Sequence, residues 1–347
     1  MTDEIDRMAS RFVRFAEQEA CASSPLYERL SRAIAGDPAM LALATRARPG
    51  QPAPNLLFAA VQYLLLKGAR SPLAAFYPRR TGRPAPADDP YPYFRQFCRA
   101  HEAQIAALLS TRRVQTNEVG RAACLLPAFG LVAHSAGDQA LALVEIGTSA
   151  GLLLLWDRYG YEYGDGRMHC DINSPVRIVC ARRGTAYPPV PAPFPPVASR
   201  LGLDLAPVDA RDPEQALWLR ALVWPEHAQR AEQLGRAMDV ARQSPPPLRA
   251  GPALTLLSQI LAAATPAAAL CVFHCFTLNQ WPRDDRARLT SLLAEYSRRR
   301  NIYHVSLEFH GDTYPELRLA AYARGVATEA VLARCQAHDE WIEWLAP

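Results

Sequence analysis

The fold of this chain is decided by the stretch Ala140-Leu141-Ala142-Leu143-Val144-Glu145-Ile146-Gly147-Thr148-Ser149-Ala150-Gly151-Leu152-Leu153-Leu154-Leu155-Trp156. It begins as an apolar run of strand length, turns through two glycines and a serine, and continues as an apolar run that can open a helix. A strand, a tight turn and a helix form the unit on which open α/β sheets bind ligands at the carboxyl edge of a strand. The turn needs small residues because the backbone approaches a ligand closely there, and the N–H groups of the following helix face that ligand.

Three functional interpretations of this turn compete. Residues 145–151 resemble the methyl-donor loop of class I S-adenosylmethionine-dependent methyltransferases, whose pattern is acid-x-Gly-x-Gly-x-Gly, with Ser149 in place of the middle glycine. Residues 147–151 also match Gly-x-Ser-x-Gly, the nucleophile elbow of serine hydrolases. A dinucleotide-binding fingerprint fails because Ser149 and Leu152 occupy two of its glycine positions. A turn without any ligand is the remaining alternative, because a short glycine motif is weak evidence by itself.

The position of the turn in the chain favours the methyltransferase interpretation. A hydrolase elbow follows a strand in the middle of a sheet, whereas the residues before 140 show helical patterns. A hydrolase triad needs an acid and then a histidine after the serine; His304 and His310 are available, but no strand-end acid stands out as their partner. Glu145 is not needed by a hydrolase, whereas a methyl-donor site uses an acid there. A serine hydrolase acting through Ser149 is kept as an alternative, and so is a degenerate methyltransferase fold that binds a ligand or partner without catalysis.

Composition excludes several function classes and predicts a cytoplasmic globular protein. Half of the 347 residues are apolar and the net charge is +4, so the many arginines are read as compositional bias and not as nucleic-acid binding. Lys67 is the only lysine and follows an apolar helix, which excludes a Walker A motif. The eight cysteines lack a C-x-x-C pair, and Cys271, His274 and Cys275 lie in one predicted strand, so no metal site is expected. We find neither a signal peptide nor an apolar run of membrane-spanning length.

Periodicity divides the chain into two predicted domains. Helical patterns dominate residues 1–138, which predicts an all-α N-terminal domain or cap. Strands alternate with helices over residues 139–347, and two strands around Gly325 close the pattern as a hairpin. This alternation predicts an α/β fold with a mostly parallel sheet and an antiparallel end. Class I methyltransferases look similar, so the predicted fold is Rossmann-like and of methyltransferase type.

Four segments resemble an uncharacterised bacterial family, a domain of unknown function. They are residues 144–152, residues 202–209, residues 218–227 with their distinctive Trp-Pro-Glu-His sequence, and Gln115-Thr116-Asn117-Glu118-Val119-Gly120-Arg121. The resemblance covers most of the chain. It implies membership of that family and no particular activity.

The methyltransferase resemblance assigns the cofactor-binding residues. S-adenosylmethionine is the expected cofactor, and its methionine part is expected to be surrounded by Glu145, Gly147, Thr148, Ser149 and Gly151. An acid after the second strand is expected to hold the ribose hydroxyls, with Asp171 and Asp204 as the two choices. Asp209 and its neighbour Asp212 are expected to meet the adenine end, although helix capping explains Asp212 as well.

Polar residues at the ends of later strands are the candidates for acting on a small-molecule acceptor. His274, Glu308 and His310 are the predicted catalytic residues, and Asn279 lies just beyond the first of these strands. Each alone is more often a structural polar group, but histidines at two strand ends on one sheet edge strengthen the functional interpretation.

The cleft is predicted to include residues from two further segments. Asn117, Glu118 and Arg121 begin a helix that leads into the central strand, where helix capping is their alternative role. Trp224 and His227 flank Pro225 at a helix junction, which a capped helix start explains equally well. No nucleic acid or membrane partner is expected.

Overall fold

The computed structural model describes residues 2–21, 23–77, 86–115, 118–169, 174–263, 267–311, 313–337 and 340–346. Contacts divide the chain into two units. The helical unit comprises Met1–Thr116 with Asp212–Glu232, and the sheet unit comprises Asn117–Arg211 with Gln233–Pro347. None of the helices in the described ranges combines the length and the apolar character that crossing a bilayer requires.

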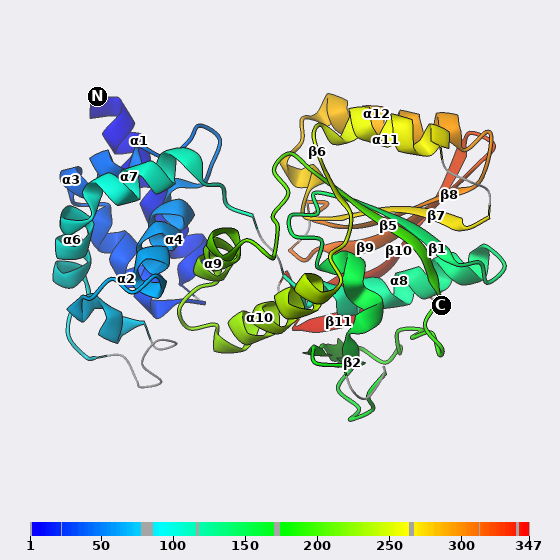
Figure 1. Cartoon of the computed structure of the whole chain (residues 1–347), viewed down its shortest axis with the longest axis horizontal. Coiled ribbons are helices and arrows are strands. Elements are labelled where there is room, and N and C mark those ends of the chain that lie inside the picture. The colour runs from blue at the N-terminus through cyan, green and yellow to red at the C-terminus, as the bar shows by residue number, and fades with distance from the viewer. Residues whose placement is uncertain are drawn as a thin grey trace. The chain divides into compact units, whose positions relative to one another are not determined.

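The helical unit forms around a strongly apolar helix, α4 (Ala53–Leu66), which is buried over most of its length. Phe58 of α4 stacks on Tyr27 with ring centroids 4.2 Å apart. Ser24 and Asp37 are the N-cap residues of the helices Pro25–Ile34 and Pro38–Ala44. The side chain of each accepts hydrogen bonds from backbone N–H groups in the first turn of its helix, and a proline follows each cap, as is common at helix starts. The unit contains α1 (Thr2–Arg14), the π-helix η1 (Phe15–Ala20), α2 (Pro25–Ile34), α3 (Pro38–Ala44), α4, the 3-10 helix η2 (Pro72–Phe76), α6 (Tyr91–Ala100), α7 (Glu102–Thr111) and α9 (Pro213–Leu222) (Figure 1). The predicted helical N-terminal region is confirmed.

The segment 212–232 packs with these N-terminal helices, although the sequence pattern assigns it to the second domain. Trp218 on α9 donates from its indole nitrogen to the Arg113 carbonyl at 2.8 Å. The Gln62 amide donates to the Val223 carbonyl at 2.7 Å. Glu226 accepts from the hydroxyl of Ser24 at 2.7 Å. Large aromatic and hydrogen-bonding side chains therefore attach this segment to the helical unit across more than a hundred residues of sequence.

The sheet unit contains a nine-stranded sheet with the order β4-β11-β10-β9-β8-β7-β1-β5-β6. Strands β6, β5, β1, β7 and β8 are parallel, β9 and β10 form an antiparallel hairpin, and β11 pairs antiparallel with β10 and parallel with β4. A mixed α/β fold with a mostly parallel sheet and an antiparallel end is confirmed. The strands are β1 (Leu141–Ile146), β4 (Ala181–Arg183), β5 (Val197–Asp204), β6 (Leu248–Ala250), β7 (Ala269–Cys275), β8 (Ile302–Glu308), β9 (Glu316–Ala323), β10 (Val326–Cys335) and β11 (Trp341–Trp344), and β2 (Gly160–Glu162) with β3 (Arg177–Val179) forms a separate pair.

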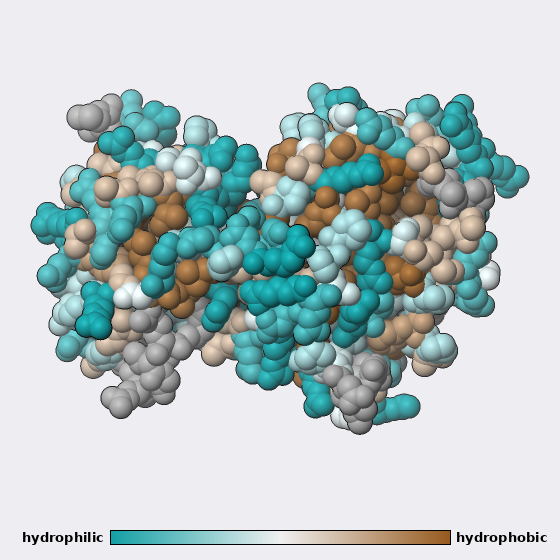
Figure 2. Space-filling view, in the orientation of Figure 1, coloured by the Kyte–Doolittle hydropathy of each residue, from teal (hydrophilic) through white to brown (hydrophobic). Residues whose placement is uncertain are grey.

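Helices cover both faces of the sheet, and strand alternation decides which side chains each face receives. Helix α8 (Arg121–Ser135) lies on one face, and α11 (Ala253–Ala263) with α12 (Arg283–Tyr296) lies on the other (Figure 1). Val144 and Val272 belong to the core packed against α11 and α12, whereas Phe273 contacts Phe129 of α8 with ring centroids 5.2 Å apart. Glu145 therefore points to the α8 face. Figure 2 shows apolar residues gathered beneath α11 and α12. Helix α10 (Ala228–Gln243) contains the boundary between the units at residue 232.

The helix expected directly after the central turn is a short 3-10 helix, η3 (Leu153–Arg158), and this part of the prediction is wrong. Two backbone carbonyls in and beside this segment accept hydrogen bonds from tyrosine hydroxyls. Tyr159 donates to the Leu152 carbonyl at 2.7 Å, and Tyr161 donates to the Trp156 carbonyl at 2.5 Å. These bonds compete with α-helical hydrogen bonds, and strand β2 begins immediately afterwards at Gly160.

We expect Gly147→Ala to destabilise the sheet unit more than Gly137→Ala. Both glycines have positive φ angles, +77° and +72°, so each alanine costs about 1 kcal/mol for the left-handed backbone. A Cβ at Gly147 would also lie 2.2 Å from Thr277 Oγ1, whereas a Cβ at Gly137 meets nothing within 4 Å. Urea unfolding followed by tryptophan fluorescence should give a loss of about 2–4 kcal/mol at Gly147. Equal losses for the two variants would contradict the close approach of Thr277.

Candidate functional site

The candidate site lies at the carboxyl edge of the sheet, where the order of strands along the chain reverses. The chain runs from β1 outward to β5 and β6, and then returns to the other side of β1 to form β7 and β8. Open α/β sheets bind ligands outside the strand ends at such a reversal. The β1 and β7 ends are aligned, because Ile146 pairs with His274, so the turn 147–151 and the segment 276–279 meet there. Gly147 is exposed at this edge, while Thr148 and Ser149 are buried.

The turn after β1 is joined to the end of β5 through Asp204. The backbone N–H of Ser149 donates to one carboxylate oxygen of Asp204 at 2.9 Å, and the N–H of Ala206 donates to the other at 2.8 Å. The hydroxyl of Thr148 donates to Glu145 at 2.6 Å. Two acids are the candidates for the ribose. Asp204 is the last residue of β5, the strand that pairs with β1, whereas Asp171 lies outside the described residues.

Burial makes Glu145 an unusually weak acid. Only 3% of this residue is exposed, and burial raises its pKa to about 8. The hydrogen bond from Thr148 and the charge of Arg121 lower the pKa, and the charge of Asp204 raises it. The carboxyl group is therefore mostly protonated at neutral pH and adds little negative charge to the edge.

An arginine and two aromatic rings lie at the same edge. The Arg121 guanidinium carbon is 4.1 Å from the centre of the Phe276 ring, and Phe309, which is 41% exposed, lies 5.5 Å from that ring. Phe276 has a φ of +52° and Ser149 has a φ of +49°. Each of these conformations costs about 1–3 kcal/mol, and such strain concentrates at functional sites. Two strained residues at neighbouring strand ends thus mark this edge.

The predicted catalytic residues His274 and Glu308 form a buried network. The two ring nitrogens of His274 contact Glu308 at 2.7 Å and His304 at 2.9 Å. Glu308 also accepts the backbone N–H groups of residues 277–279. Burial raises the pKa of Glu308, but the hydrogen bonds from His274 and this backbone offset it, and the pKa is lowered overall. Burial and the neighbouring His274 lower the pKa of His304 to about 3.

This network positions the backbone: through Glu308 it holds the segment after β7 against the end of β8. It lies on the α11 and α12 face, opposite Glu145, since His274 follows Val272 by two residues in the same strand. His310 lies just beyond β8 and is exposed. Among the described residues, no group of three or more histidine, cysteine or acidic side chains is arranged to hold a metal ion.

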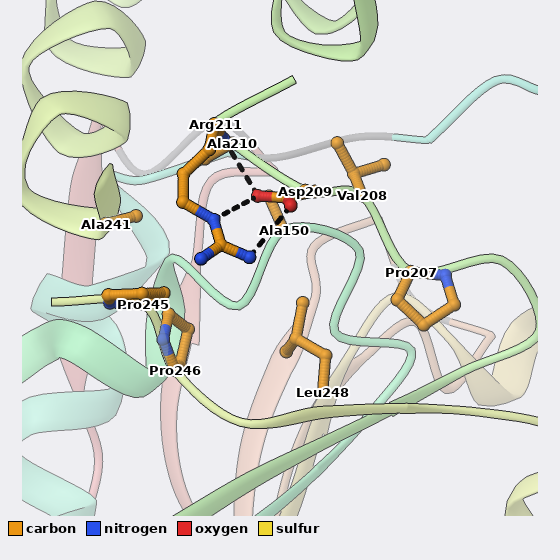
Figure 3. A pocket seen from close by; sticks show the side chains of 10 residues that line it. All are labelled: Ala150, Pro207, Val208, Asp209, Ala210, Arg211, Ala241, Pro245, Pro246 and Leu248. Carbon is orange, nitrogen blue, oxygen red and sulfur yellow. Dashed lines mark hydrogen bonds and ion pairs between the residues drawn. The ribbon is translucent and has the colours of Figure 1, made fainter. Parts of the chain in front are cut away.

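A cavity of about 230 Å³ lies beside the turn (Figure 3). Ala150 from the turn and Asp209 border it, and the sequence analysis did not identify its remaining wall. Asp209 pairs with Arg211 at 3.0 Å, and this hydrogen-bonded pair lowers the pKa of the Asp209 carboxyl. The wall is assembled from Pro207, Val208, Ala210, Arg211, Ala241, Pro245, Pro246 and Leu248, which come from separate segments that no local pattern connects.

The structure brings most predicted site residues to one edge and places a few elsewhere. Glu118 is buried just before α8, and Asn279 is exposed after β7. Trp224 lies in the helical unit against the rings of Phe15 and Tyr27, and His227 contacts the Ser23 hydroxyl there at 3.0 Å. Asn117 lies outside the described residues. The edge residues are Glu145, Gly147, Thr148, Ser149, Gly151, Asp204, Arg121, His274 and Glu308.

Comparison with known proteins identifies a family that covers nearly the whole chain. A family model described as an uncharacterized protein conserved in bacteria, DUF2332, matches residues 9–344. The chain belongs to this family. No curated protein and no solved structure matches this member of DUF2332. The predicted membership of an uncharacterised bacterial family is confirmed.

We expect Glu145→Gln to remove a loss of stability that accumulates as the pH rises from about 4.5 to about 8. The Glu145 pKa of about 8 in the folded protein exceeds the ordinary 4.5, so the folded state holds a proton that the unfolded state has released between these values. Wild-type stability therefore falls as the pH rises from about 4.5 to about 8, and the glutamine variant should lack this fall. Between pH 6 and pH 9 the variant should gain about 2–3 kcal/mol relative to wild type in thermal or urea unfolding. Glu329→Gln at an exposed position is the control, and parallel pH profiles for wild type and Glu145→Gln would overturn the assignment.

Proposed function

We propose that this DUF2332 protein binds S-adenosylmethionine at the carboxyl edge of its sheet and transfers the methyl group to a small-molecule acceptor. The observation that supports this most is the hydrogen bond between the Ser149 N–H and the Asp204 carboxylate. It joins a turn that resembles a methyl-donor loop to an acid at the end of the neighbouring parallel strand. Class I methyltransferases are similar in using an acid after the second strand to hold the ribose hydroxyls.

The strand order also supports the proposal. The order β6-β5-β1-β7-β8 corresponds to the 3-2-1-4-5 order of nucleotide-binding doubly wound sheets. The antiparallel β9–β10 hairpin then ends the sheet in the manner expected from the methyltransferase resemblance. This likeness concerns architecture, and the site residues carry the functional argument.

The residues at the edge fit a nucleoside cofactor with an amino-acid part. Gly147 presents exposed backbone, Asp204 is half-buried with carboxylate oxygens facing the turn, and Asp209 borders the cavity beside Ala150. Asp204 would hold the ribose hydroxyls, residues 147–151 would contact the methionine part, and Asp209 would lie toward the adenine. The bound cofactor would supply an electrophilic methyl group.

Methyl transfer places modest demands on the protein, because the reaction depends mainly on the alignment of donor and acceptor. A base is required where the acceptor must lose a proton. Both ring nitrogens of His274 are engaged by Glu308 and His304, so His274 acts in this proposal by fixing the strand ends. His310, exposed beyond β8, is the predicted catalytic residue able to accept a proton from an acceptor.

One observation favours the serine hydrolase alternative. Ser149 adopts the positive φ that a nucleophile elbow requires. However, Ser149 is only 4% exposed, and the Nε2 atom of His304, one of the two histidines available for a triad, is engaged by His274 at 2.9 Å. We therefore expect no labelling of Ser149 by a fluorophosphonate probe; labelling of the wild type that disappears in Ser149→Ala would establish the hydrolase instead.

We expect S-adenosylhomocysteine to bind the wild type, and Asp204→Asn to weaken that binding about 10-fold or more. The amide retains the shape of the side chain, but it loses the charged acceptor for ribose hydroxyls and one of the two acceptors for the backbone N–H groups of Ser149 and Ala206. Isothermal titration calorimetry measures both affinities. Asp285→Asn on α12, where Asp285 pairs with Arg288, is the matched control and should bind as the wild type does.

Failure of the wild type to bind at millimolar concentration would exclude the methyl-donor proposal. If binding is found, incubation with a radiolabelled methyl donor and a bacterial small-molecule extract separates catalysis from the non-catalytic alternative. Transfer of label to an extract component is the expected result.

A further inference from the structure

Arg121 is a buried cation for which the described residues supply no hydrogen bond to Nε and no ion pair. It is the first residue of α8, and only 6% of it is exposed. Within the part of the chain that the structure describes, its Nε has no hydrogen-bond partner and no carboxylate forms an ion pair with its guanidinium. Its contact with the Phe276 ring, at 4.1 Å, is an interaction with a neutral group. Buried arginines in proteins are normally paired, so this one requires an explanation.

The contacts that Arg121 does make are too weak to offset its burial. Removing a guanidinium from water is costly even after the protein relaxes. A cation–π contact returns only part of that cost. An anion in contact with the guanidinium would compensate the remainder.

The N-terminus of α8 adds partial positive charge beside Arg121. The first turn of a 15-residue helix carries partial positive charge, and α8 has no side-chain cap at its N-terminus. Glu145 is the carboxyl group whose pKa responds to Arg121, but with its pKa raised to about 8 by burial it is mostly neutral at pH 7.

We propose that Arg121 binds the carboxylate of a ligand at the sheet edge, with Phe276 beneath the guanidinium and the turn 147–151 beside it. A planar guanidinium is the side chain best suited to a carboxylate, because it donates two parallel hydrogen bonds. The carboxylate belongs either to the amino-acid part of the methyl donor or to the acceptor. This assignment of the ligand rests on the proposed function, whereas the existence of the anion site does not.

The anion site is tested without any cofactor. Thermal unfolding is measured in sodium formate, the smallest carboxylate, and in sodium chloride at equal ionic strength, for wild type, Arg121→Met and Arg300→Met. Formate should raise the Tm of the wild type by about 1–3 °C, since binding to the folded state stabilises it. Arg121→Met should lose this shift. Arg300→Met should keep it, because Arg300 donates to the Ala268 carbonyl at the opposite edge of the sheet.

A formate shift that is equal in wild type and Arg121→Met, or that is absent from the wild type, would overturn the site. If Arg121→Met does not fold, Arg121→Gln replaces it and the same outcomes apply.

The source of the carboxylate is tested by calorimetry with two nucleosides. S-adenosylhomocysteine has the amino-acid carboxylate, and 5′-methylthioadenosine lacks it. If the donor supplies the carboxylate, Arg121→Met weakens the binding of S-adenosylhomocysteine about 10- to 100-fold and leaves the affinity for methylthioadenosine unchanged. If the acceptor supplies it, both affinities stay unchanged while the formate shift is lost. A formate shift that depends on Arg121 in a protein that binds neither nucleoside would keep the anion site and refute the methyl-donor proposal.

Discussion

The hydrogen bonds to the Asp204 carboxylate hold the carboxyl edge of the sheet together where the candidate site lies. One oxygen accepts from the turn after β1 and the other from the segment after β5, so a single side chain fixes two strand ends. Ser149 can direct its N–H toward Asp204 because it adopts a left-handed backbone. Thr148 then lies over Gly202, where a Cβ would be 2.5 Å from its methyl group. The hydrogen bond between Ser149 and Asp204 therefore requires both the left-handed backbone of Ser149 and the absence of a side chain at Gly202.

The same geometry determines the charge at the edge. Once Thr148 is held over β5, its hydroxyl donates to Glu145, and the burial of both side chains keeps that carboxyl mostly neutral. Arg121 faces this neutral acid from α8 and remains charged. The proposed anion site rests on this combination of a neutralised acid and a retained cation. Burial thus changes the charge at the edge in a way that the list of residue types does not reveal.

Local sequence patterns predict the central strands and the terminal hairpin, but they do not predict the short 3-10 helix after the central turn or which elements become neighbours. The apolar runs of β1, β7 and β8 and the hairpin around Gly325 are visible in the sequence because they obey strand length and turn chemistry. The choice between Asp171 and Asp204 depended on which strand lies beside β1, and strand order is a tertiary property. The attachment of residues 212–232 to the N-terminal helices depends on single long-range bonds such as that of Trp218, which periodicity does not encode.

The site itself was predictable as a set of residue types but not as a division of roles. Alternation along β1 and β7 places Glu145 and His274 on opposite faces of the sheet. They nevertheless lie close together along the strands, because His274 pairs with Ile146, the residue after Glu145. Thr277 connects the two sides: its N–H donates to Glu308, and its hydroxyl donates to the Ile146 carbonyl at 3.2 Å beside Gly147. The histidine network therefore reaches the turn through this threonine. Groups on the other face hold the backbone in place, and the proposed ligand contacts come from the α8 face.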